Sequence, residues 1–528
     1  MVRSLSRRVL LEAIGVSVAL GLVDAGNADD RPRPPGLKLG DAFPFSFDLL
    51  RDIARRKAEE TPIAPARPYA GISEKIDYEA WGEITFDTDF ALFPDGPLPV
   101  TFFHLARFFA KPVVMHVIED GGAREILYDP RYFRMPIDSP ARQLPSGAGF
   151  AGFRVQERRD GALDWRKNDW VAFLGASYFR AIGELRQYGL SARAVALDTA
   201  VADKDEEFPD FTEIYLEKPG AGSDTITVSA LLEGPSITGA ARFVMTRGKG
   251  VVMDIDQSLF LRRAVSRFGI APLTSMYWFS ETAKPVAVDW RPEVHDSDGL
   301  AIWNGRGEHL WRPLCNPPHN VASAFGDENP KGFGLLQRDR LFDHYLDGVH
   351  YERRPSLWVE PKGDWGRGSV QLIELPTDDE IRDNIVAAWV PEAPAGPGSQ
   401  FDVAYRLHWL ADEPYPAPLA RCVATRLGKG GQPGRPRPAG VVKFVVEFLG
   451  GPLARLPFGV KPDMEVHASR GQFTDYRIVE AVPDDLPGHW RAEFDLAGVE
   501  GSGPVELRLQ LKVAGETASE TWLFQYHP

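Results

Sequence analysis

Strict alternation of apolar and polar residues is the feature that most constrains this fold. Residues 505–513 read Val-Glu-Leu-Arg-Leu-Gln-Leu-Lys-Val, and the stretches Thr225–Leu231 and Phe401–Trp409 follow the same period of two. Successive side chains of a strand point to opposite faces, so this period predicts half-buried antiparallel sheet. With 50 glycines and 44 prolines, the chain can also turn often between strands. We therefore expect an all-β protein.

One helix and one domain boundary interrupt this pattern. Residues 46–60 carry Leu49, Leu50 and Ile53 at helical spacing behind a capping Ser46, which predicts a surface helix. Residues Val390–Ser399 contain three prolines and two glycines, which favours a linker at 392–399 over a long loop within one domain, although the loop stays open. We expect an enlarged two-sheet sandwich over 42–391 and an immunoglobulin-like sandwich over 400–528.

The first residues have the pattern of an export signal. Arg7 and Arg8 precede a weakly apolar run from Ala13 to Val23, and small residues follow up to Ala28. This order is typical of a twin-arginine signal peptide over 1–28 and predicts a periplasmic protein. An amphipathic helix is the alternative, because Glu12 interrupts the apolar run. Prolines over 29–41 predict a linker, and no later stretch is apolar for long enough to span a membrane.

Charge and cysteine content exclude several partners. The net charge of −14 opposes binding to nucleic acid or to anionic lipid. Cys315 and Cys422 stand too far apart for a metal knuckle, and two free thiols are favoured over a disulfide. The usual nucleotide, serine-hydrolase and zinc-protease motifs are absent. We expect no cofactor and no metal ion.

Tryptophans gather in one part of the chain. Of thirteen, eight fall between residues 278 and 409: Trp278, Trp290, Trp303, Trp311, Trp358, Trp365, Trp389 and Trp409. Indole faces stack on sugar rings and acidic side chains bind hydroxyls, so this mixture suits carbohydrate, with Trp358 and Trp365 as candidate substrate-binding residues. For any single tryptophan, packing in the core is an equal alternative.

Two acidic motifs in the same part of the chain can carry chemistry. The turn His295–Gly299 includes Asp296, which could bind a cation or activate water; a solvated turn between strands is the alternative. Thr377 has capping-box spacing to Glu380 and predicts a helical turn that ends near Asp383. A carboxyl at a helix C-terminus holds its proton tightly, as a general acid must, whereas a capping aspartate is the alternative.

A third group of residues has metal-binding side chains but the wrong spacing. Asp339, Asp343, His344, Asp347 and His350 fit no established metal site, so a charged surface turn is favoured.

Several stretches of the chain, taken in order, resemble the osmoregulated periplasmic glucan biosynthesis proteins of the G/D type, some of which are placed in glycoside hydrolase family 186. Besides the turn after His295, these stretches are Phe173–Arg180, Tyr188–Arg193, Glu207–Phe211, Gly269–Met276, Asn329–Asp339, Arg354–Pro361, Asp383–Val386 and Ser519–Trp522. The resemblance implies a galactose-mutarotase-like β-sandwich joined to an immunoglobulin-like domain. The twin-arginine start looks more like the D type than the G type.

The resemblance also implies a chemistry and its residues. Family members cleave β-1,2-glucan with inversion or transfer the chain to close a ring. In that pattern Asp383 corresponds to the general acid and Asp296 to the base, and Tyr351 and Arg354 match positions that line the glucan cleft. The loop 428–440 departs from the family, since it is shorter and has no aromatic residue, which puts the balance between hydrolysis and transfer in doubt.

The resemblance therefore implies an inverting glucanase or transglycosylase. A non-catalytic protein that binds glucan and guides nascent chains to membrane partners is the main alternative, and a mutarotase-like epimerase rests on fold analogy alone. β-1,2-Glucan is the expected ligand; an inner-membrane glucan synthase as partner and a homodimer stay open.

Overall fold

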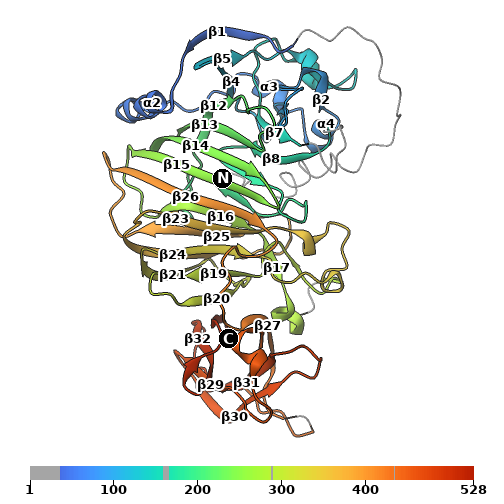
Figure 1. Cartoon of the computed structure of the whole chain (residues 1–528), viewed down its shortest axis with the longest axis vertical. Helices are drawn as coiled ribbons and strands as arrows, with labels where there is room; N and C mark the ends of the chain where they lie inside the picture. Colours follow the sequence, from blue (N-terminus) through green and yellow to red (C-terminus); the bar gives the residue numbers. More distant parts are fainter. Residues whose placement is uncertain (1–35, 158–165, 287–288, 433) are drawn as a thin grey trace.

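Strands dominate the computed structural model, which describes residues 36–157, 166–286, 289–432 and 434–528. Two extended sheets face each other in the large domain, and a smaller sandwich of strands lies at one end of the molecule (Figure 1). The predicted all-β class is confirmed. The predicted signal peptide over 1–28 lies outside the described residues.

The larger sheet has sixteen strands among the described residues and runs through both sandwiches. In spatial order they are β1 (Leu39–Pro44), β5 (Gly122–Ile126), β4 (Val114–Glu119), β12 (Asp210–Glu217), β13 (Thr225–Glu233), β14 (Ile237–Arg247), β15 (Val251–Leu261), β26 (Gln400–Leu410), β23 (Ser356–Lys362), β22 (Gly332–Leu336), β19 (Gly299–Trp303), β20 (His309–Pro313), β34 (Thr521–Tyr526), β32 (Val505–Val513) and β29 (Asp463–Ala468), with β33 (Glu516–Thr517) beside β32.

The second sheet of the large domain has ten strands in the described part of the chain. They are β21 (Val321–Glu328), β24 (Arg367–Glu374), β25 (Ile385–Pro391), β16 (Phe268–Ser275), β10 (Ser191–Arg193), β9 (Tyr178–Ala181), β8 (Asp169–Leu174), β7 (Gly152–Gln156) and β3 (Val100–Phe103), with β11 (Val195–Leu197) beside β16. Two short pairs stand apart: β17 (Tyr277–Phe279) with β18 (Val294–His295), and β2 (Thr85–Phe86) with β6 (Phe133–Arg134).

Aromatic contacts between the two sheets show where the core lies. The Phe173 ring on β8 meets Phe243 on β14 at 5.1 Å, and Phe268 on β16 meets Phe401 on β26 at 4.7 Å. Buried apolar residues of both sheets form one continuous cluster between these layers. Burial of this apolar surface is the main force that holds the large domain together.

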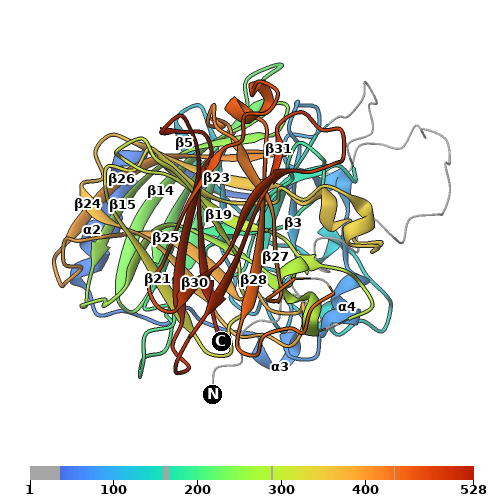
Figure 2. The ribbon, with the colours of Figure 1, turned by 90° about the horizontal axis from the view of Figure 1, so that it is seen from below.

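The C-terminal sandwich has its own core. Its second sheet consists of β27 (Arg421–Lys429), β28 (Val442–Leu449), β31 (His489–Ala497) and β30 (Gln472–Ala481), and it faces β29, β32 and β34. The rings of Phe494 on β31 and Trp522 on β34 lie 6.3 Å apart across the two layers. Figure 2 looks along the long axis with β28 and β30 of this sandwich in front of the large domain.

The predicted boundary between the domains is wrong by one strand. β26 follows the linker, yet it pairs along its length with β15 on one side and β23 on the other, in the middle of the large sheet. Its alternation was read correctly as a strand, but alternation does not reveal which sheet a strand joins. The C-terminal sandwich therefore begins after Leu410, and 392–399 is a connection within the large domain.

The predicted helix is α2 (Phe47–Glu59), and Ser46 caps it by accepting a hydrogen bond from the Leu49 N–H at 3.1 Å. Its buried side chains Leu50 and Ala54 pack on β13, β14 and β15, on the face of the large sheet that points away from the main core. Two short helices, α3 (Ala70–Ser73) and α4 (Tyr78–Gly82), complete the α-helices of the described residues. None of the described helices is long and apolar enough to cross a membrane.

Two smaller expectations have clear outcomes. The predicted linker over 29–41 ends too late, because β1 begins at Leu39 and pairs with β5. Cys315 and Cys422 are free thiols, of which only Cys422 is fully buried.

Candidate functional site

Asp383 lies immediately before β25, on a backbone that Asn384 holds in place. The Asn384 side chain accepts a hydrogen bond from the Tyr277 N–H at 2.8 Å and donates to the carbonyl oxygens of Tyr277 and Leu375 at 2.8 and 2.9 Å. These bonds join β17, β25 and the segment after β24 at one point. The position of the Asp383 carboxylate is thus fixed by its neighbour.

The predicted helical turn before Asp383 does not form. Residues 378–382 are bends and turns, and the Thr377 hydroxyl bonds the backbone of Asp379. The Thr377 side chain therefore stabilises a turn instead of capping a helix. Ser and Thr side chains often bond to the nearby backbone of turns in this way. A helix dipole therefore cannot act on Asp383.

A buried arginine is the charged partner of Asp383. Arg180 on β9 places Nη2 3.7 Å from Asp383 Oδ2, and its side chain is almost wholly buried. Burial lowers the pKa of Arg180, and the charge of Asp383 opposes that shift. Arg193 on β10 also acts electrostatically on Asp383, while it binds Glu206 at 2.7 Å. The ten-stranded sheet thus supplies positive charge to this carboxylate.

Asp296 occupies the turn between β18 and β19 and is 0% exposed. The alternative of a solvated turn is therefore wrong for this residue. Arg354 places Nε 3.6 Å from Asp296 Oδ1, and its Nη1 donates to the Tyr188 carbonyl at 2.7 Å. A buried carboxylate is stable only with such a partner, because desolvation of an unpaired charge is costly.

Tyr351 connects this pair to a second group of charges. Its ring lies 5.1 Å from the Arg354 guanidinium, and its hydroxyl donates to Glu380 Oε2 at 2.6 Å. Arg291 donates to the same Glu380 oxygen at 2.8 Å and to Asp347 at 2.6 Å. Three segments far apart in the sequence therefore meet here: the approach to β18, the segment around η7 (Tyr351–Arg353), and the turn before Asp383.

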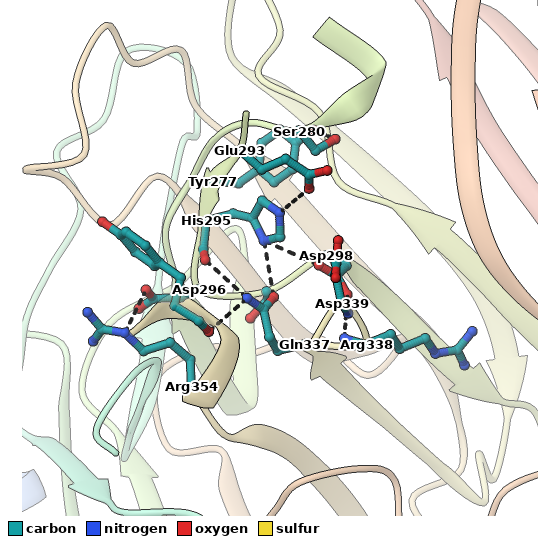
Figure 3. Close-up of polar contacts among 12 residues, drawn as sticks. Tyr277, Ser280, Glu293, His295, Asp296, Asp298, Gln337, Arg338, Asp339 and Arg354 are labelled. Carbon is teal, nitrogen blue, oxygen red and sulfur yellow. Dashed lines mark hydrogen bonds and ion pairs between the residues drawn. The ribbon is translucent and has the colours of Figure 1, made fainter. Parts of the chain in front are cut away.

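A buried histidine network lies behind Asp296 (Figure 3). His295 Nε2 bonds Glu293 at 2.9 Å and Nδ1 bonds Gln337 Oε1 at 3.0 Å, with Asp298 at 3.2 Å from the same nitrogen. Gln337 in turn donates to the carbonyl oxygens of His295 and Tyr351 at 3.3 and 3.1 Å. Both ring nitrogens face acceptors, so the network suits a doubly protonated imidazolium.

The charges of this network shift several pKa values. Burial opposes the charged form of His295, but the hydrogen bond to Glu293 and the charge of Asp298 outweigh it and raise the pKa to about 9. Burial raises the pKa of Asp298 to about 6, against the attraction of His295. Burial, reinforced by the charge of Glu293, raises the pKa of Glu281 in η5 (Glu281–Val286) to about 7.

The tryptophan prediction is mostly wrong. Trp358 is 1% exposed and packs in the core shared with the C-terminal sandwich, so it cannot contact a glucan; Trp311, Trp389 and Trp409 are also buried. Trp365 is half-buried at the end of β25 opposite Asp383, where it lines an open cavity of about 690 Å³. Trp290 is the exposed member of the group and lies beside Arg291.

The residues of the third group, between Asp339 and His350, bind different partners. Asp347 binds Arg291, and His350 bonds Glu352 at 2.9 Å. Asp339 and His344, by contrast, contact each other directly. The residues that the spacing argument missed are Arg180, Arg291, Gln337 and Glu380. Arg180 carried a signal, because it is a lone charge inside the apolar stretch Phe173–Ala181; the other three did not stand out in a polar context.

Fold and site define an all-β protein of packed sheets in which buried carboxylates are paired with buried arginines. A family model described as "Periplasmic glucan biosynthesis protein, MdoG" matches residues 45–526. The chain belongs to this family.

Curated relatives agree over nearly the whole length. "Glucans biosynthesis protein D 2" of Ralstonia nicotianae is 63% identical over 99% of this chain and 98% of its own. "Glucans biosynthesis protein D" of Stenotrophomonas maltophilia is 48% identical over 93% of this chain and 91% of its own. Among solved structures, the Slr1438 protein of Synechocystis sp. PCC 6803 aligns with 58% of this chain and 98% of its own at 10% identity. The TM-score of 0.23 is too low to indicate a shared fold.

Proposed function

We propose that this protein acts on β-1,2-glucan in the periplasm as an inverting glucanase or transglycosylase, with Asp383 as general acid and Asp296 as general base. One observation carries the proposal: both carboxylates border a single group of buried arginines. Arg180 lies 3.7 Å from Asp383 and Arg354 lies 3.6 Å from Asp296, and the two arginines act electrostatically on each other. Tyr351 and Glu380 extend the same polar site.

The different surroundings of the two carboxylates support different roles. Asp296 is wholly buried beside Arg354, which favours a carboxylate that accepts a proton. The Asp383 side chain is 15% exposed, so it can approach a substrate. In inversion the acid protonates the glycosidic oxygen while the base removes a proton from the attacking water. In transfer a sugar hydroxyl replaces that water, and the same proton movements balance.

The relatives support the substrate and the compartment. The family is described as periplasmic, and the similar proteins are named for glucan biosynthesis. Export by the twin-arginine route, through residues 1–28, belongs to the same proposal and rests on Arg7 and Arg8.

The test incubates linear β-1,2-glucan with the native protein and with Asp383→Asn, and follows product masses by mass spectrometry. The native protein is expected to give shorter linear chains, or rings lighter by one water. Loss of a general acid typically lowers the rate by ~10²–10⁴-fold, so Asp383→Asn should give almost no product while it still binds glucan in calorimetry.

Asp378→Asn is the matched control, because Asp378 is an exposed carboxylate in the same turn. It should retain native activity. If neither native protein nor control alters the glucan although all three bind it, the enzymatic proposal fails and the guiding role of a non-catalytic glucan-binding protein takes its place.

A further inference from the structure

Three residues with metal-binding side chains converge on one point next to the His295 network. One ligand atom each of Glu293, Asp339 and His344 lies within 4.8 Å of the other two. Glu293 precedes β18, Asp339 follows β22, and His344 belongs to η6 (Phe342–His344). The spacing of Asp339 and His344 alone fits no metal site; the fold adds the third residue from a separate segment.

The donor set suits a first-row transition metal. Two carboxylate oxygens and one imidazole nitrogen form a common ligand set for Zn²⁺ and for Mn²⁺, Fe²⁺ or Co²⁺, whereas Ca²⁺ and Mg²⁺ prefer oxygen alone. The side chains of Glu293, Asp339 and His344 are 7%, 20% and 40% exposed. An ion held there would therefore be anchored on a buried carboxylate and would still reach water for its remaining ligands.

Glu293, the buried member of this group, is held in place by the His295 network. Its Oε2 accepts a hydrogen bond from His295 at 2.9 Å, and Glu293 as a whole is only 5% exposed. A carboxylate this deeply buried is costly unless positive charge lies near it. Because Glu293 takes part in the convergence with Asp339 and His344, a cation at that point would help to offset this cost.

We propose that Glu293, Asp339 and His344 bind one divalent transition-metal ion, with water as the remaining ligands. The ion would tie η6 to the strands β18 and β22, and so fix the segment that leads to Tyr351 and Arg354. This site is distinct from the proposed catalytic pair and does not depend on the activity of the protein.

The probe is Zn²⁺, titrated into chelator-treated, metal-free protein by isothermal calorimetry. The native chain is expected to bind one equivalent saturably, and His344→Asn should weaken that binding at least tenfold. His350→Asn is the matched control: His350 is 42% exposed and pairs with Glu352 at 2.9 Å, much as His344 pairs with Asp339, but it has no place in the three-residue group. The control should bind Zn²⁺ as tightly as the native chain.

Asp339→Asn provides a second variant, and circular dichroism verifies that every variant is folded. Tenfold weakening in both ligand variants, with the control unchanged, supports the site. The proposal is overturned if the native chain binds no stoichiometric Zn²⁺, or if His344→Asn and Asp339→Asn bind it like the control.

Discussion

Arginine–carboxylate pairs and one buried histidine set the character of the site at the scale of single residues. Asp383 and Asp296 each lie near a buried guanidinium, and His295 lies between Glu293 and Gln337. Of these groups His295 titrates away from its usual range, because the hydrogen bond to Glu293 and the charge of Asp298 outweigh its burial and raise its pKa to about 9.

His295 should make stability depend on pH above neutrality. Its folded-state pKa is about 9 against 6.5 for an ordinary histidine, so the folded protein holds this proton more tightly than the unfolded chain. The stabilisation is complete below pH 6.5 and is lost as the pH rises through 9. We expect the free energy of unfolding, measured in urea, to fall over this window.

His295→Gln should flatten that decline, leaving a remainder from His344, whose pKa is also raised. His309→Gln is the control, because burial lowers the pKa of His309 and moves its contribution below pH 6.5. An equal slope in the His295 variant and the native protein would contradict the assignment.

The sequence identified some residues of the site and missed others. The resemblance selected Asp383 and Asp296, and the structure adds Arg180 and Arg354 as their partners. The prediction for Trp358 was wrong because the sequence around a tryptophan does not show whether its side chain packs in a core or binds a ligand. Only the packing in the folded structure distinguishes these two cases. Glu293 was missed because its partners come from a different segment, and convergence of this kind has no signature in spacing.

At the scale of elements, glycines on β22 make room for Trp358 on the neighbouring strand. A Cβ added to Gly332 would overlap the Trp358 indole. Gly332→Ala should therefore force the indole or the strand to shift and lower the free energy of unfolding by ~1–3 kcal/mol. Urea unfolding measures the effect.

Gly326→Ala on β21 is the matched control, because no atom lies within 4 Å of the added Cβ. Its stability should be unchanged or slightly higher. Equal stabilities of the two variants would show that the indole adapts freely, against the close packing described here.

Arg291 connects two loops through ion pairs. It binds Asp347 and Glu380 from two different segments, and Glu380 also accepts a hydrogen bond from the Tyr351 hydroxyl. Arg291→Met should leave these carboxylates to repel each other, and hydrogen exchange of residues 342–353 and 378–383 should become faster while β8 and β16 stay protected. Unchanged exchange in both loops would contradict this role.

At the scale of the whole molecule, Arg338 joins the two sandwiches. It follows β22, binds Glu413 after β26 at 3.2 Å and Glu520 before β34 at 2.9 Å, and lies 3.7 Å from the Trp311 ring. Arg338→Met would remove the arginine partner of the buried Glu520 and leave Glu413 with Arg421 alone, and should cost ~3–5 kcal/mol in urea unfolding. Arg306→Met, at an exposed arginine, should cost nothing measurable. A cost below ~1 kcal/mol for Arg338→Met would show that the interface does not need this ion pair.

Alternation predicted three strands, β13, β26 and β32, the last with its observed bounds, but not the path of the sheets. Pairing partners such as β26 and β15 are set by contacts across long stretches of chain, and the residues of one strand carry little information about them. The all-β class could therefore be predicted, and the domain boundary could not.

The position of β26 in the large sheet also determines when that sheet can form during synthesis. The strand is synthesised after both neighbours, β15 and β23, yet it is the only link between them in the path of the large sheet through the described residues. Until residues 400–410 emerge from the ribosome, that sheet exists as two pieces, each with an open edge that could pair with a foreign strand. The two pieces are joined only when about three-quarters of the chain has been made, so these edges stay open for most of the time that synthesis takes.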